Sequence, residues 1–132
     1  MIGILLVTHG DLGQALIDVV VHVMGPQPSF RAVGIYPDSD MEAKRKEISD
    51  TISELDQGEG VLILTDMFGG TPSNLAIAHL NRSNTEVIAG VNVPMLVKIA
   101  SIRSTSNLFD LCCQAQEAGR KYMTVASLLL AS

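Results

Sequence analysis

Apolar residues along this chain gather in short runs that end at glycine or polar positions. Three runs, over residues 2–8, 61–65 and 86–92, are apolar at nearly every position. A short unbroken apolar run is typical of a strand that is buried on both faces of a parallel sheet. A fourth strand is predicted over residues 30–36, where the turn that begins at Pro37 ends it. These four segments predict the sheet.

The segments between the strands place apolar residues at the three- and four-residue spacing of an amphipathic helix. The first helix is predicted over residues 12–24 and ends before Gly25. Ser39, with Glu42 three residues later, resembles a capping box at the start of a helix that runs to about residue 55. Three more helices are predicted, from Pro72 to about Asn81, from Met95 to Ser101 and from Leu108 to Lys121.

Alternating strands and helices predict an α/β fold, with a mostly parallel open sheet and helices on both faces. The sequence contains no repeat, low-complexity segment or linker, so we expect residues 1–132 to form a single domain. The tail from Tyr122 to Ser132 is apolar and contains β-branched residues. By itself this tail fits either an edge strand or a short helix.

Composition narrows the class of protein. With 47% hydrophobic and 17% charged residues, the chain is expected to be globular. Its net charge of −5 argues against a nucleic-acid partner, which would require a basic face. The adjacent Cys112 and Cys113 do not suit a disulfide, and we find neither a signal peptide nor an apolar run long enough to span a membrane. We therefore expect a cytoplasmic protein.

Polar residues follow two of the buried strands and form the candidate site. His9 follows the first apolar run, and Asp66 follows the run at residues 61–65. Ligands of open α/β sheets bind beyond the carboxyl ends of the strands, so His9 and Asp66 can meet if their strands are neighbours. Thr71 is a candidate N-cap for the helix that starts at Pro72, and free N–H groups at that helix end favour an anion. Gly69 and Gly70 let the backbone approach a ligand closely.

These residue types suit a phosphorylated histidine. A neutral imidazole is a nucleophile, and a carboxylate at Asp66 would fix its tautomer and aim the other nitrogen outward. Backbone N–H groups and the Thr71 hydroxyl would hold the phosphoryl oxygens, and this chemistry requires neither a metal nor a cofactor. Each residue also has a structural interpretation, because Asp66 could cap a turn and the glycines could simply begin a helix. His22 and His79 fit helix surface or packing, and the histidines lack metal-site spacing.

Three motifs together resemble a known family, the IIA component of the bacterial sugar phosphotransferase system (PTS) of the mannose/fructose/sorbose type. They are Val7–Gly10, Thr65–Asn74 and Ala89–Met95, and the resemblance covers nearly the whole chain in order. It implies a phosphotransferase with a phosphohistidine intermediate, which accepts its phosphoryl group from the phosphocarrier protein HPr. The group then passes to a IIB component, here a separate chain, and membrane contact is only indirect, through IIC and IID components.

The resemblance also implies the roles of individual residues. His9 is the phosphoryl acceptor and Asp66 bonds its imidazole. It places Thr71 at the phosphoryl site, and we expect Gly69, Gly70 and Gly10 to bind the phosphoryl group together with it. The family fold ends in an antiparallel edge strand, which would place such a strand at the tail from Tyr122. Members form homodimers, in some cases by exchanging that strand.

The sequence leaves other functions open. A standalone IIA protein could serve regulation, with the phosphorylation state of His9 read by a partner. A histidine phosphatase would need an arginine beside the histidine, whereas Thr8 and Gly10 flank it here. The phosphocarrier subunit of dihydroxyacetone kinase shares the fold, but the motifs fit the sugar type better. Four residues could form either an apolar rim for docking HPr or a loop packed on the core, namely Met67, Phe68, Pro72 and Met95.

Overall fold

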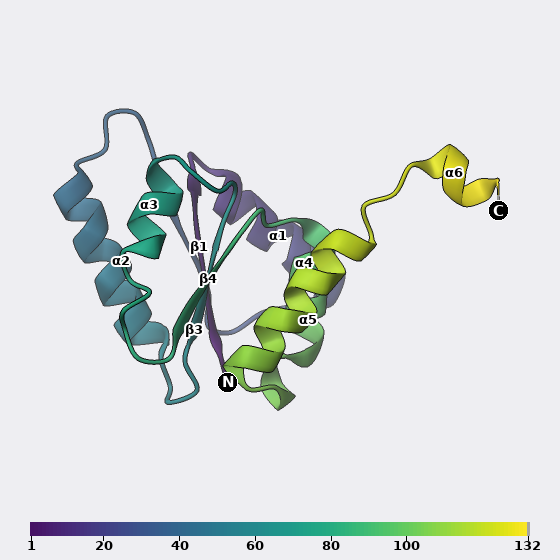
Figure 1. The fold of residues 1–132 in the computed structure, drawn as a ribbon. Helices are drawn as coiled ribbons and strands as arrows, with labels where there is room; N and C mark the ends of the chain where they lie inside the picture. The colour runs from purple at the N-terminus through teal and green to yellow at the C-terminus, as the bar shows by residue number, and fades with distance from the viewer. Residues whose placement is uncertain (132) are drawn as a thin grey trace.

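The computed structural model describes residues 1–131, which form a parallel sheet covered by helices on both faces (Figure 1). The strands are β1 (Gly3–His9), β2 (Phe30–Ile35), β3 (Val61–Thr65) and β4 (Thr85–Ala89). The helices are α1 (Leu12–Met24), α2 (Met41–Leu55), α3 (Thr71–Ile77), α4 (Val93–Ile102), the 3-10 turn η1 (Arg103–Thr105), α5 (Leu108–Lys121) and α6 (Ala126–Leu130). The strand order is β2-β1-β3-β4 with every pair parallel, which confirms the predicted α/β class.

Strand β1 explains why the first apolar run is unbroken. Its side chains alternate between two cores: Ile4 and Leu6 face the helices α1, α4 and α5, whereas Leu5 and Val7 face α2 and α3. All four side chains are fully buried. A strand with helices on both faces has no solvent side, so every position favours an apolar residue.

Several helix and strand ends differ from the prediction. Asp40, rather than Ser39, caps α2, and its carboxylate accepts hydrogen bonds from the N–H groups of Glu42 and Ala43. The residue that caps α3 is Gly70 rather than Thr71. Helix α3 ends at Ile77 instead of near Asn81, and turns occupy the residues that follow it. The last strand ends at Ala89, since Asn92 leaves the sheet to cap α4.

The predicted antiparallel edge strand is wrong for the described part of the tail. Residues 126–130 form α6, which stands away from the body of the molecule beyond the end of α5 (Figure 1). A strand needs a neighbouring strand to satisfy its N–H and C=O groups, and within residues 1–131 no strand pairs with the outer edge of β4. Alanine and leucine favour a helix when no such partner is present. Ser132 lies outside the described residues.

Candidate active site

His9 and Asp66 lie side by side at the carboxyl edge of the sheet. His9 is the last residue of β1, Asp66 follows β3, and β1 and β3 are paired neighbours. The His9 ring nitrogen Nδ1 lies 2.8 Å from Asp66 Oδ2. The backbone N–H of His9 donates to the same oxygen at 3.1 Å, and that of Met67 donates to Oδ1 at 3.2 Å. Hydrogen bonds to both of its oxygens thus fix the orientation of the carboxylate toward the imidazole.

Hydrogen bonds decide the charge of Asp66. Its partial burial alone would raise the pKa, but the hydrogen bonds from the ring and from the backbone N–H of His9 help to outweigh burial, and the pKa is lowered below its usual value. The carboxylate is therefore ionised at neutral pH and acts as an acceptor, so Nδ1 of a neutral imidazole carries the proton. Because folding lowers the pKa of Asp66, the ionised carboxylate stabilises the folded protein at neutral pH. This stabilisation is lost as the pH falls through the lowered pKa.

The imidazole is open to solvent. The His9 side chain is 53% exposed, whereas that of Asp66 is 14% exposed. With Nδ1 directed at Asp66, Nε2 is the nitrogen that remains for chemistry. Gly70 passes close to this edge of the ring, because a Cβ placed on Gly70 would lie 3.8 Å from Nε2. Gly70 has φ +107° and ψ 170°, a conformation that is essentially restricted to glycine.

The other predicted site residues lie around this pair at different distances. Thr71 is exposed and begins α3 directly after Gly70. Gly10 follows His9 in a left-handed turn with φ +54°. Gly69 adjoins Gly70 in the chain, but a Cβ placed on Gly69 would meet no atom within 4 Å. The structure thus brings Gly70 against the ring and leaves Gly69 in open space.

The apolar rim proposed from the sequence divides into two groups. Met67 and Phe68 are 55% and 78% exposed and stand beside the site. Pro72 and Met95 are instead buried, so the packing interpretation holds for them. Leu12, at the start of α1, adds a further exposed apolar side chain near the His9 turn. The exposed rim therefore consists of Leu12, Met67 and Phe68.

Sequence analysis missed one contact at this edge. Tyr36, directly after β2, donates its hydroxyl hydrogen to the carboxylate of Asp11, at the start of α1. The signal was available, because residues that follow paired parallel strands share one edge of the sheet.

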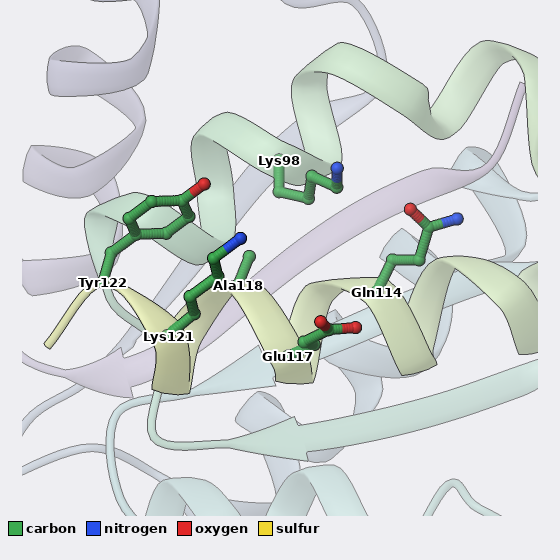
Figure 2. A pocket seen from close by; sticks show the side chains of 6 residues that line it. All are labelled: Lys98, Gln114, Glu117, Ala118, Lys121 and Tyr122. Atoms are coloured by element: carbon green, nitrogen blue, oxygen red, sulfur yellow. The ribbon is translucent and has the colours of Figure 1, made fainter.

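Other candidate residues lie apart from His9. A hollow of about 220 Å³ between α4 and α5 is lined by Lys98, Lys121 and Tyr122 among others, and by none of the predicted site residues (Figure 2). His22 is exposed on α1, and burial lowers the pKa of His79. Both cysteines are free thiols. Among residues 1–131, no group of histidine, cysteine and carboxylate side chains could hold a metal ion, and no helix is both long and apolar enough to cross a bilayer.

The fold and this site define a small α/β protein that presents a carboxylate-oriented histidine where two parallel strands end. Residues 3–116 match the protein family described as "PTS system fructose IIA component". This match covers most of the chain, and the chain therefore belongs to the IIA components of the sugar phosphotransferase system. The resemblance carried by the three sequence motifs is confirmed.

Curated relatives give the same family. The PTS system mannose-specific EIIAB component of Escherichia coli is 34% identical over 122 residues, which cover 91% of this chain and 38% of that protein. The PTS system fructose-specific EIIA component of Bacillus subtilis is 27% identical over 128 residues, which cover 96% of this chain and 88% of that protein. The chain thus spans less than half of the mannose-specific relative and most of the fructose-specific one.

Solved structures share the fold. The phosphotransferase system component EIIA from Streptococcus agalactiae superposes with a TM-score of 0.88 at 21% identity, covering 97% of this chain and 99% of that one. The PTS IIA protein associated with the fucose utilization operon from Streptococcus pneumoniae superposes with a TM-score of 0.83 at 26% identity, covering 97% and 95%.

Proposed function

We propose that this chain is a phosphoryl carrier of sugar uptake that works in the cytoplasm. It accepts a phosphoryl group from phosphorylated HPr on Nε2 of His9 and passes that group to a IIB component. The observation that carries the proposal is the hydrogen bond between His9 Nδ1 and the ionised Asp66, made by a ring that is more than half exposed. Membership of the IIA family supports the same role.

The transfer step follows from this geometry. Asp66 accepts the Nδ1 hydrogen, which leaves a lone pair on Nε2. That lone pair forms a bond to phosphorus while the bond between phosphorus and the donor's histidine nitrogen breaks, and the bonding electrons return to the donor nitrogen. The developing positive charge on the His9 ring is stabilised by Asp66. Transfer to IIB repeats the step with His9 as the leaving group.

The surroundings of Nε2 suit the phosphoryl group in this proposal. The Thr71 hydroxyl and the backbone of Gly10, Gly69 and Gly70 supply polar groups around its oxygens. The exposed rim of Leu12, Met67 and Phe68 supplies apolar surface for the partner. Partners dock one at a time on this edge, because both must reach the same nitrogen.

The decisive experiment is incubation of the full chain with phosphorylated HPr. We expect one phosphoryl group per chain, bound to His9 and labile to acid, as shown by intact mass and peptide mapping. A phosphorylated IIA protein of the same family, run in parallel, controls for the activity of the donor. An unmodified chain beside a labelled control would overturn the proposal.

Replacement of Asp66 by alanine tests the role of the carboxylate. We expect phosphoryl acceptance to slow by about 10- to 100-fold, the range found when carboxylates that orient metal-ligating histidines are removed. The fold should persist, as checked by circular dichroism, because Asp66 lies at the edge of the sheet. The rate is measured by rapid quench after mixing with phosphorylated HPr, and normal transfer would refute the tautomer argument.

Gly70→Ala tests whether the loop beside the ring is required. The backbone conformation of Gly70 is unfavourable for alanine, so we expect a loss of about 1–3 kcal/mol in unfolding free energy together with slower transfer. Gly25 is a matched control, because it has φ 87° and ψ 179° at the end of α1, with open space around it. Gly25→Ala should cost similar stability, measured by urea unfolding, and leave the transfer rate unchanged.

The proposed function includes a homodimer in which the tail of one copy covers β4 of the other. The outer edge of β4 is unpaired within residues 1–131, and a groove beside it is bordered by Phe109, which is 76% exposed. Met123 and Leu128 in the tail are 78% and 72% exposed. In the dimer, the apolar side chains of the tail would cover this groove and shield the edge of β4 from water.

Truncation after Tyr122 tests the dimer. We expect light scattering to show a dimer for the full chain and a monomer for the truncated one. Leu128→Ser should weaken the dimer, whereas Ser127→Ala should not. A truncated chain that remains dimeric would exclude the tail from the interface.

A further inference from the structure

Tyr36 and Asp11 form a hydrogen-bonded contact beside the turn that carries His9. Strands β1 and β2 are parallel, and His9 is paired with Ile35, so Tyr36 emerges next to the residues that follow His9. The Tyr36 hydroxyl donates to Oδ1 of Asp11. This bond therefore joins the residue after β2 to the second residue after His9.

The turn between His9 and Asp11 packs closely on the end of β2. The N–H of Gly10 donates to the carbonyl oxygen of Ile35 at 2.8 Å. A Cβ placed on Gly34 would lie 2.4 Å from the Gly10 carbonyl oxygen and 3.0 Å from the Tyr36 hydroxyl. Gly34 thus allows the turn and the tyrosine to lie against the strand. The Tyr36–Asp11 hydrogen bond then holds the tyrosine against the turn.

The Asp11 carboxylate is not used to cap its helix. An aspartate at this position ordinarily accepts hydrogen bonds from N–H groups of the first turn. Asp11 makes no such bond, and the buried hydroxyl oxygen of Thr8 instead accepts the N–H of Gly13 at 2.8 Å. The carboxylate is therefore held by Tyr36, and without that hydroxyl it would carry an unrestrained negative charge two residues from the phosphoryl acceptor.

We propose that Tyr36 is a positioning residue for phosphoryl transfer, because its hydroxyl holds the Asp11 carboxylate at the end of β2 and keeps its charge from opposing the phosphoryl group at His9. This inference rests on the proposed function. A phosphoryl group is itself an anion, so a nearby mobile carboxylate raises the energy of both the transfer step and the phosphorylated state. The tyrosine acts on His9 only through Asp11.

Phosphoryl transfer to paired variants tests the electrostatic role. Tyr36→Phe retains the ring and removes the hydroxyl, and we expect it to slow acceptance from phosphorylated HPr by about 10-fold. The double variant Tyr36→Phe/Asp11→Asn removes the charge as well and should return to within about twofold of wild type. A tyrosine with a merely structural role would leave the double variant as slow as Tyr36→Phe.

A titration tests the contact without phosphoryl transfer. The chain has two tyrosines, and Tyr122, which lies at the hollow between α4 and α5 (Figure 2), supplies the control. Tyr122→Phe should transfer phosphoryl groups at the wild-type rate, and it leaves Tyr36 as the sole tyrosine. The bond to Asp11 raises the pKa of Tyr36 above 10.0, and Asp11→Asn in this background should lower it, as measured by tyrosinate absorbance.

The outcomes separate the two proposals. Absence of phosphorylation in the wild-type chain would overturn the proposed function and this inference with it, even if the titration shows the contact. Normal phosphorylation of wild type together with an equally fast Tyr36→Phe would overturn the positioning role alone. A Tyr36 titration that Asp11→Asn does not change would show that the contact is absent in solution, and the positioning role would fall with it.

Discussion

Replacement of His9 by glutamine is expected to abolish phosphoryl acceptance, with a loss of at least about 1,000-fold. The glutamine amide can still donate a hydrogen bond to Asp66 but has no nucleophilic lone pair on nitrogen. Because the His9 side chain is 53% exposed, the unfolding free energy should change by only about 0.5 kcal/mol. Intact mass after incubation with phosphorylated HPr measures the loss directly.

His22 provides the matched control for this variant. It is exposed on α1, and no predicted site residue contacts it through a hydrogen bond or ion pair described for residues 1–131. His22→Gln should therefore accept a phosphoryl group at the wild-type rate. Retained phosphorylation of His9→Gln, or loss in His22→Gln, would move the acceptor away from His9.

The fold could be predicted from the sequence wherever a strand is buried on both faces of the sheet. The unbroken apolar runs at residues 2–8 and 61–65 correspond to β1 and β3, because strands covered on both faces tolerate no polar face. The tail at residues 126–130 could not be assigned in the same way. Its secondary structure depends on whether a partner strand is available, and a pattern of apolar residues carries no information about that.

The candidate site was predictable to the extent that topology decides it. His9 and Asp66 follow neighbouring parallel strands, so the edge rule brings them together. The burial of Pro72 and Met95 was not predictable from their position beside the motifs, because it depends on how the helices pack. Tyr36 and Asp11 follow paired parallel strands, so the same rule brings them to one edge, but no periodic pattern marks the hydrogen bond between them.

Arg103 shows a second contact of this kind, at the opposite end of the sheet from His9. Sequence analysis could place it only in a polar segment after a helix, but its side chain is 1% exposed. Its guanidinium donates to the carbonyl oxygens of Ile2, Pro28 and Ser29, and it lies 4.9 Å from the centre of the Phe30 ring. Burial lowers its pKa to about 10, so the group remains charged at neutral pH. Its hydrogen bonds connect the end of α4 to the residues that precede β1 and β2.

Arg103→Met should therefore destabilise the fold more than the changes at His9, Asp66 or Gly70. Methionine fills part of the space but removes the guanidinium donor from the carbonyl oxygens of Ile2 and Pro28, at a cost of about 1–3 kcal/mol for each group that water cannot reach. The Ser29 carbonyl oxygen keeps the hydrogen bond from the N–H of Ile4. We expect a total loss of about 3–5 kcal/mol in unfolding free energy, a large part of the stability of a small domain. Urea unfolding at pH 7 measures this loss.

Two further variants separate the possible reasons for that loss. Arg103→Lys keeps the charge but not the planar set of donors, so it should fall between wild type and Arg103→Met. Arg120→Met removes an exposed arginine from α5 and should change the unfolding free energy by less than about 0.5 kcal/mol. Because Arg103 is at the far end of β1 from His9, the folded fraction of Arg103→Met should still accept phosphoryl groups at the wild-type rate. A loss of transfer in fully folded protein would instead mean that the two ends of β1 are coupled.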